Sequence, residues 1–247
     1  DGVTGQPKKS DDFTIYKVTQ YDTLPKIANY YGIPLAQIMH DNRVQDMLLV
    51  ENNTLFIRNP KKNATVPYTP PALDDTEKAK IDAALMGRGL HCEFGFEPVN
   101  LNTGNFYLNR TDISIPDYTD DFAIERNYNS KGAELSGVFG RGWSFDYTEQ
   151  ITKDKDGNLR YRRGDGSILI FTEKDGKYTA PAGYELKLSR KKIKENTFDF
   201  GSGEESYPVY EYTITDETNV TKTFNYFGML TSIEDEKGNQ TVLTYDD

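Results

Sequence analysis

Residues 154–176 read DKDGNLRYRRGDGSILIFTEKDG. Three turn-forming pieces that combine glycine with aspartate divide this stretch at intervals of about ten residues: 156–158, 164–166 and 175–176. Between them lie runs of strand length, such as SILIFT at residues 167–172. Strand-length runs separated by glycine turns are typical of antiparallel hairpins joined in sequence order. The stretch therefore predicts a β-meander.

The same pattern extends to both sides of this stretch. From Phe94 onward the residues alternate with period two, and a further turn lies at residues 237–239. Residues 221–227 and 239–245 are both rich in threonine and end in an aromatic residue, which is a weak internal repeat. Repeats too small to bury their own faces stack into longer structures. Because the last run reads as a strand with an unpaired edge, we expect the natural protein to continue beyond Asp247.

Residues 13–58 have the periods of a separate small domain. Residues 14–18 alternate as a short strand, residues 35–39 predict a short second helix, and residues 55–57 predict a closing strand. The first helix is indicated by apolar residues at i, i+3, i+4 and i+7, which are Leu24, Ile27, Ala28 and Tyr31. The order strand, helix, helix, strand predicts an antiparallel pair of strands with both helices on one face.

Residues 60–92 predict a linker between the two regions. Prolines are frequent from residue 60 to residue 71, and residues 74–77 can cap a helix that runs to about Met86. The predicted fold class is mainly β with a small α+β domain, a linker with a short helix, and then an antiparallel β-meander. The predicted boundaries are 13–59 for the small domain, 60–92 for the linker, 93–150 for a region that opens the sheet, and 151–247 for the meander.

Composition excludes several classes of partner. Lysine and arginine total 29 against 39 aspartates and glutamates, which gives a net charge of −10. An acidic surface repels phosphate backbones and anionic lipids, so we expect neither nucleic acid nor a membrane surface as a partner. No apolar run approaches the length of a membrane span. The single cysteine, Cys92, excludes an internal disulfide.

Residues that could carry catalysis or hold a metal are few and poorly spaced. His91 and Cys92 are adjacent, and His40 lies at the end of the second predicted helix, so no zinc-ligand spacing is present. Residues 154–158 place glycine fourth, whereas an EF-hand calcium loop places it sixth. Residues 140–143, GRGW, precede a strand-like run, which indicates a tight turn before a buried tryptophan rather than a phosphate loop. We expect no catalytic residue, metal or cofactor.

A binding site is better supported in the small domain. The loop after its first strand, residues 20–23, and the loop after its second helix, residues 45–53, should lie side by side at one end. Backbone amides, a tyrosine face and an apolar floor suit an extended sugar chain. The alternative is that these apolar residues only close the small core.

Several pieces of the small domain carry a resemblance to LysM domains. They are Tyr16-Lys17-Val18, Asp22-Thr23-Leu24, Ile27-Ala28, Tyr31-Gly32-Ile33, Ile38, Asn42 and Leu55-Phe56-Ile57. The resemblance implies a βααβ fold that binds N-acetylglucosamine glycans such as peptidoglycan or chitin. It also implies a groove with two walls, formed by Tyr21, Asp22, Thr23 and Leu24 and by Met47, Leu48, Leu49 and Val50.

The chain departs from the LysM pattern in both loops. Tyr21 stands where the family usually has glycine, and Glu51-Asn52-Asn53 replace its usual Pro-Gly-Gln turn. These departures affect the proposed sugar contacts rather than the fold.

The second half of the chain resembles Rhs/YD-repeat proteins. The matching pieces are residues 97–106 (EPVNLNTGNF), 111–116 (TDISIP), 126–130 (RNYNS), 137–143 (GVFGRGW) and a YD-like repeat at 228–246. Rhs proteins are polymorphic toxins of bacterial competition whose repeats form a hollow β-shell around a C-terminal toxin. The resemblance implies that the toxin and the self-cleaving core lie beyond Asp247.

Three functional hypotheses follow. The first is a secreted or cell-wall-associated targeting and encapsulation fragment, in which the LysM domain holds peptidoglycan and the strands start the shell. The second is an adaptor whose LysM-like domain docks on a secretion or injection component. The third, a wall hydrolase, is disfavoured because no catalytic set is present.

Overall fold

The structure is a computed structural model that describes residues 13–58, 99–100, 103–115, 122–133, 136–199 and 204–245. The predicted linker and helix at residues 60–92, together with His91 and Cys92, lie outside the described residues. Within the described ranges, no helix has both the length and the hydropathy that a membrane span needs.

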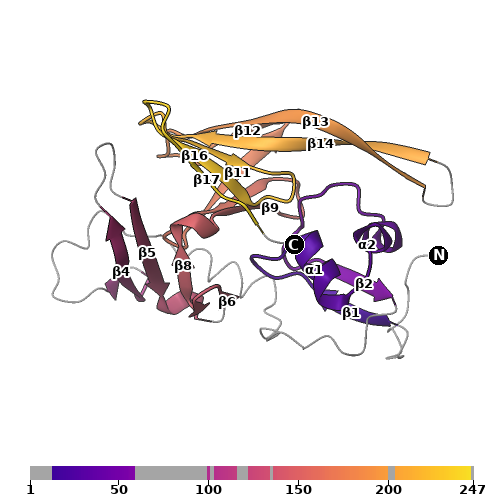
Figure 1. The fold of residues 1–247 in the computed structure, drawn as a ribbon, viewed down its shortest axis with the longest axis horizontal. Helices are drawn as coiled ribbons and strands as arrows, with labels where there is room; N and C mark the ends of the chain where they lie inside the picture. The colour runs from indigo at the N-terminus through magenta and orange to yellow at the C-terminus, as the bar shows by residue number, and fades with distance from the viewer. Residues whose placement is uncertain are drawn as a thin grey trace.

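The front domain has the predicted order of strand, helix, helix and strand (Figure 1). Its elements are β1 (Phe13–Lys17), α1 (Leu24–Tyr31), α2 (Leu35–Asn42) and β2 (Thr54–Arg58). The two strands pair antiparallel, with Tyr16 opposite Leu55. Thr23 caps α1 because its hydroxyl oxygen accepts a hydrogen bond from the Lys26 amide at 3.4 Å. Gly32 ends the helix in a left-handed conformation with φ 60°.

One apolar core joins these four elements. It contains residues from both helices, both strands and the loop after α2, and Leu24 and Ile57 are fully buried. Val18 lies one residue beyond β1, yet its side chain is also buried and its amide donates to the Asn53 carbonyl at 2.8 Å. Burial of such side chains is the main stabilising contribution in a domain this small.

Antiparallel sheets make up the rest of the described chain. The first has the order β3-β4-β5-β8, and its strands are β3 (Val99–Asn100), β4 (Asn105–Ile115), β5 (Phe122–Asn129) and β8 (Trp143–Phe145). The second is a meander of β9 (Gln150–Lys153), β10 (Leu159–Arg162), β11 (Ile168–Lys174) and β12 (Lys177–Thr179). The third is a meander of β13 (Lys187–Asp199), β14 (Glu204–Thr215), β15 (Thr221–Phe224), β16 (Leu230–Glu234) and β17 (Gln240–Val242). The mainly β fold with a small α+β front domain is therefore confirmed.

The segment before β8 contains the predicted tight turn but corrects one expectation. A short hairpin of β6 (Ser136–Gly137) and β7 (Gly140–Arg141) leads into Trp143. Trp143 is half-buried rather than buried. The Arg126 guanidinium lies 4.8 Å from the centroid of its ring. Gly142 has φ 76°, and an added Cβ would lie 2.8 Å from the Tyr128 ring, so the position requires glycine.

A single turn geometry recurs along the meanders. The side chains of Asp154, Asp216, Asn225 and Asp235 each accept hydrogen bonds from the backbone amides two and four residues later. This explains why residues 154–158 form a hairpin turn. It also corrects the predicted arm at residues 221–227, since the strand ends at Phe224 and residues 225–229 form the turn.

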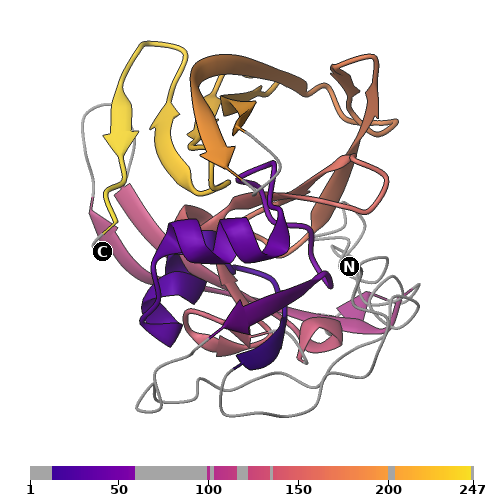
Figure 2. The same cartoon turned by 90° about the vertical axis from the view of Figure 1, so that its right-hand side faces the viewer.

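The second and third sheets pack face to face over a shared core. Its buried side chains come from β9, β10 and β11 on one side and from β14, β15 and β16 on the other, and they include Phe171, Tyr212 and Phe224. In Figure 1 the long β13–β14 hairpin extends over the front domain. Figure 2 shows the front domain lying in front of the sheets when the molecule is turned by 90°.

Candidate functional site

The two predicted groove walls lie side by side, as expected from the sequence. The Asn52 amide donates to the Val18 carbonyl at 3.0 Å, which fastens the loop before β2 to the loop after β1. Two of the predicted wall residues, Thr23 and Leu24, face the interior instead of a groove, with exposures of 1% and 0%. Met47 also belongs to the front-domain core.

Asp22 of the first wall forms hydrogen bonds within its own domain. Its carboxylate accepts hydrogen bonds from the Tyr16 hydroxyl at 2.8 Å, the Thr19 amide at 2.7 Å and the Thr19 hydroxyl at 3.0 Å. Burial raises the pKa of Asp22, and the hydrogen bonds from Thr19 and Tyr16 oppose that rise. Three donors from β1 and the loop meet at one carboxylate oxygen, Oδ2, so the side chain of Asp22 holds the loop against β1.

Strand β9 covers the first wall. The Gln150 side-chain carbonyl accepts a hydrogen bond from the Tyr21 amide at 3.0 Å, and the Gln150 side-chain amide donates to the Asp22 carbonyl at 3.0 Å. Gln150 itself is buried, with 4% of its surface exposed. One carboxamide therefore binds two adjacent backbone groups of the LysM-like loop.

The second wall is also covered by β9. The Lys153 amide donates to the Leu49 carbonyl at 3.0 Å, and Val50 forms a parallel β-bridge with Lys153. The Lys153 ammonium forms an ion pair with Asp46. The side chain of Leu48 packs in the core between the two meanders instead of the core of its own domain.

Charged and aromatic contacts complete the contact between the domains. Buried Glu51 lies 3.7 Å from the Arg160 guanidinium and 3.5 Å from that of Arg162, and it accepts a hydrogen bond from the Thr152 hydroxyl at 3.0 Å. The Arg162 guanidinium also lies 5.3 Å from the centroid of the Tyr21 ring, a cation–π geometry.

Both departures from the LysM pattern therefore contact the sheet. Tyr21 has φ 62°, a conformation that suits glycine, and its ring lies under an arginine of β10. Glu51 stands in the altered turn. These departures were the only signal in the sequence for the contact between the LysM loops and the sheet, because the sheet residues in that contact read as ordinary strand residues. These sheet residues are Gln150, Thr152, Lys153, Arg160 and Arg162.

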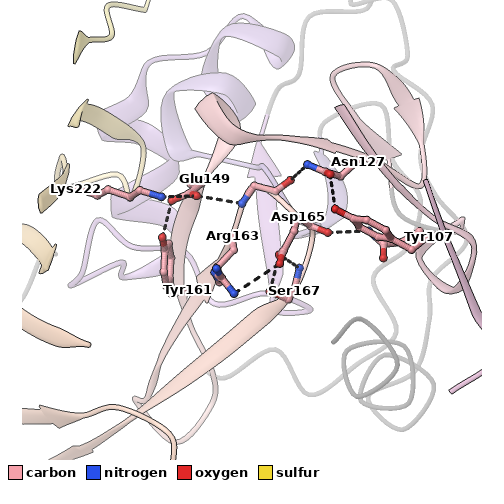
Figure 3. Close-up of polar contacts among 10 residues, drawn as sticks. Tyr107, Asn127, Glu149, Tyr161, Arg163, Asp165, Ser167 and Lys222 are labelled. Atoms are coloured by element: carbon pink, nitrogen blue, oxygen red, sulfur yellow. Dashed lines mark hydrogen bonds and ion pairs between the residues drawn. The ribbon is translucent and has the colours of Figure 1, made fainter. Parts of the chain in front are cut away.

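A second polar cluster ties the sheets to one another (Figure 3). The Glu149 carboxylate accepts hydrogen bonds from Lys222 at 2.7 Å, from the Tyr161 hydroxyl at 2.6 Å and from the Gly164 amide at 3.1 Å. The Gly164 carbonyl in turn accepts from Asn127 on β5 at 3.1 Å. Burial, followed by the charge of Glu149, raises the pKa of Tyr161 well above its ordinary value.

This cluster has the chemistry of a structural tie. Both oxygens of Glu149 accept hydrogen bonds, and these join the residue before β9 to β10, β15 and the turn after β10. An adjacent cavity of about 310 Å³ is lined by both cations and acids, including Arg163, Lys222, Asp216 and Glu217. Within the described residues, no three His, Cys, Asp or Glu side chains gather as a metal site.

Comparison with known proteins identifies the front domain. Residues 16–58 match the LysM domain family, so a LysM domain is found there. LysM domains are typical of cell-wall or extracellular proteins. Residues 96–171 match a family described as "Domain of unknown function (DUF6531)".

The chain is also similar to three curated nucleases. They are "tRNA nuclease WapA" of Bacillus subtilis (strain 168), "tRNA(Glu)-specific nuclease WapA" of Bacillus subtilis subsp. natto (strain BEST195) and "tRNA3(Ser)-specific nuclease WapA" of Bacillus spizizenii. Each is 31% identical over 154 residues, which is 60% of this chain. The match spans only 6% of each relative.

Proposed function

We propose that this chain is the non-catalytic front part of a large bacterial Rhs/YD-repeat toxin. Its LysM domain binds peptidoglycan, and its strands begin the β-shell that encloses a C-terminal toxin. The LysM match at residues 16–58 and the similarity to WapA nucleases over 154 residues support this proposal. The sheet order also supports it, because strands β13 to β17 pair in sequence order, so further strands can add at β17.

The observation that carries the proposal is the shared packing of the LysM domain and the meander. Leu48 of the LysM domain lies in the core between the sheets, and Val209 of β14 lies in the core of the LysM domain. This packing joins the LysM domain to the first strands of the proposed shell. The toxin activity and its target belong to other parts of the natural protein under this proposal.

The residues proposed for glycan contact fall into two groups. Tyr21, Val50 and the backbone groups of Asp22 and Leu49 face strands β9 and β10, and Leu48 packs in the core between the sheets, so a glycan would contact them where the two loops separate from the sheet. Thr23, Leu24 and Met47 support that surface from the interior. We propose the first group as the glycan contacts and the second as their scaffold.

Co-sedimentation with purified peptidoglycan tests the proposal. We expect the chain to be retained, and we expect soluble N-acetylglucosamine oligomers to displace it. Tyr21→Ala should reduce retention, whereas Tyr184→Ala, in the cavity of the meander, should not. If neither the chain nor a variant with a weakened contact to β9 is retained, glycan binding is rejected.

A second candidate function is an adaptor whose LysM domain docks on a component of the secretion apparatus. One observation favours it: the loops of this LysM domain already bind a protein surface through Tyr21 and Glu51. Binding to a purified export component without retention on peptidoglycan would favour this candidate over the first.

A further inference from the structure

We propose that strand β9 caps the glycan-binding end of the LysM domain, so that sheet docking and glycan binding exclude each other. This inference rests on the proposed function and concerns the regulation of the same site. A glycan can reach the two loops only when they separate from β9. The docked arrangement is therefore a closed state in which the glycan-binding loops are covered.

The cap occupies the backbone groups that a sugar ligand would need. Gln150 binds the Tyr21 N–H and the Asp22 carbonyl, and the Lys153 N–H binds the Leu49 carbonyl. These three backbone groups lie on both walls. With them satisfied by β9, the closed state has no free donor or acceptor at these positions for a ligand.

The chemistry of Gln150 matches that of the expected ligand. Its side-chain carboxamide presents one carbonyl acceptor and one N–H donor to neighbouring backbone groups. The acetamido group of an N-acetylhexosamine presents the same pair, a carbonyl oxygen and an N–H. Gln150 therefore acts as an intramolecular substitute for the acetamido group of the sugar.

Opposite charges face each other across the contact between the LysM domain and the sheet. Glu51 is 7% exposed and faces Arg160 and Arg162 of β10, and the Arg162 guanidinium lies over the Tyr21 ring. Separation of the two surfaces exchanges these contacts for water. A ligand that binds only the open form shifts the population toward that form.

The consequence is a quantitative link between opening and affinity. The apparent dissociation constant equals the intrinsic constant divided by the fraction of open molecules. Any change on the sheet side that raises this fraction tightens glycan binding without touching the LysM domain. Gln150→Ala removes two hydrogen bonds, so we expect glycan affinity to rise about tenfold.

A reversible covalent lock gives the sharpest test. Val50 and Lys153 are bridge partners, and neighbouring strands lie about 4.8 Å apart, within the range of Cα separations that a disulfide spans. The double substitution Val50→Cys and Lys153→Cys, with Cys92→Ser to remove the other thiol, therefore closes the cap when oxidised. Binding of chitohexaose is measured by calorimetry on the oxidised and the reduced forms of the same protein.

We expect the reduced form to bind, the oxidised form to lose binding at least tenfold, and Gln150→Ala to bind more tightly than the unmodified chain. Equal binding by oxidised and reduced forms would overturn the cap while leaving glycan binding intact. Absence of binding in every form, including Gln150→Ala, would overturn the proposed glycan function and the cap together. Gln240→Ala, on the exposed strand β17, is the matched control and should bind as the unmodified chain does.

Discussion

The side-chain carbonyl of Gln150 accepts a hydrogen bond from the Tyr21 amide at 3.0 Å, across 129 positions of sequence. This contact joins the first strand of the second sheet to the first loop of the LysM domain. Together with the contacts of Lys153 and Glu51, it docks the LysM domain directly on the second sheet.

Glu51→Ala should strongly destabilise the chain, because it leaves Arg160 and Arg162 facing each other at a buried site. Removal of one partner from a buried ion pair costs about 3–5 kcal/mol of unfolding free energy. Urea denaturation followed by fluorescence measures the loss. Glu236→Ala, in an exposed turn, is the control and should change stability by less than about 0.5 kcal/mol. A small loss at Glu51 would show that the charges are solvated.

Gly228→Ala should destabilise the chain more than Gly238→Ala. Both glycines occupy the same position in their turns, with φ 82° and 83°. An added Cβ at Gly228 would lie 2.0 Å from the Ile151 carbonyl and 3.0 Å from Leu48, whereas nothing lies within 4 Å at Gly238.

The control therefore reports backbone strain alone, about 1 kcal/mol, and the excess at Gly228 reports the tight contact between the sheets and the LysM domain. We expect that excess to be at least about 2 kcal/mol in thermal or urea unfolding. Equal losses for the two variants would contradict the packing described around Leu48.

Asp146→Asn should stabilise the chain at neutral pH but not at acidic pH. Burial, and then the charge of Glu149, raises the pKa of Asp146 from 3.8 to about 6. The folded state thus binds the proton more tightly than the unfolded state, and the stability that this supplies is fully present below about pH 3.8 and is lost as pH rises through about 6.

The asparagine variant does not ionise, so its stability should exceed that of the unmodified chain by about 1–2 kcal/mol above pH 7, allowing for partial exposure, and converge with it near pH 4. Urea midpoints measured between pH 4 and pH 8 provide the comparison. A constant difference across that range would show that Asp146 titrates normally. Glu236→Gln serves as the exposed control.

Local signals in the sequence predicted the elements well. The helical spacing of apolar residues, the alternation of the strands and the glycine turns act within a few residues, so the βααβ order and the meander followed from them. The strand at residues 221–227 was extended too far because Asn225 forms a turn through its side chain, which alternation of residues does not reveal.

Long-range packing could not be predicted in the same way. Gln150 and Lys153 read as ordinary residues of a strand, and nothing nearby in sequence says that a LysM loop lies against them. Trp143 is half-buried, and the partner of its ring is Arg126 of strand β5, which the local pattern around residues 140–143 does not reveal. The altered residues Tyr21 and Glu51 were visible in the sequence, but the surface that they contact was not.

Amide hydrogen exchange at Lys153 reports whether the LysM domain is docked on β9, because in the closed state this amide donates to the Leu49 carbonyl of the LysM domain. We expect slow exchange at this amide in the unmodified chain, and faster exchange when Gln150→Ala weakens the cap. Exchange at the rate of an exposed strand edge in the unmodified chain would contradict the docking of the LysM domain on β9.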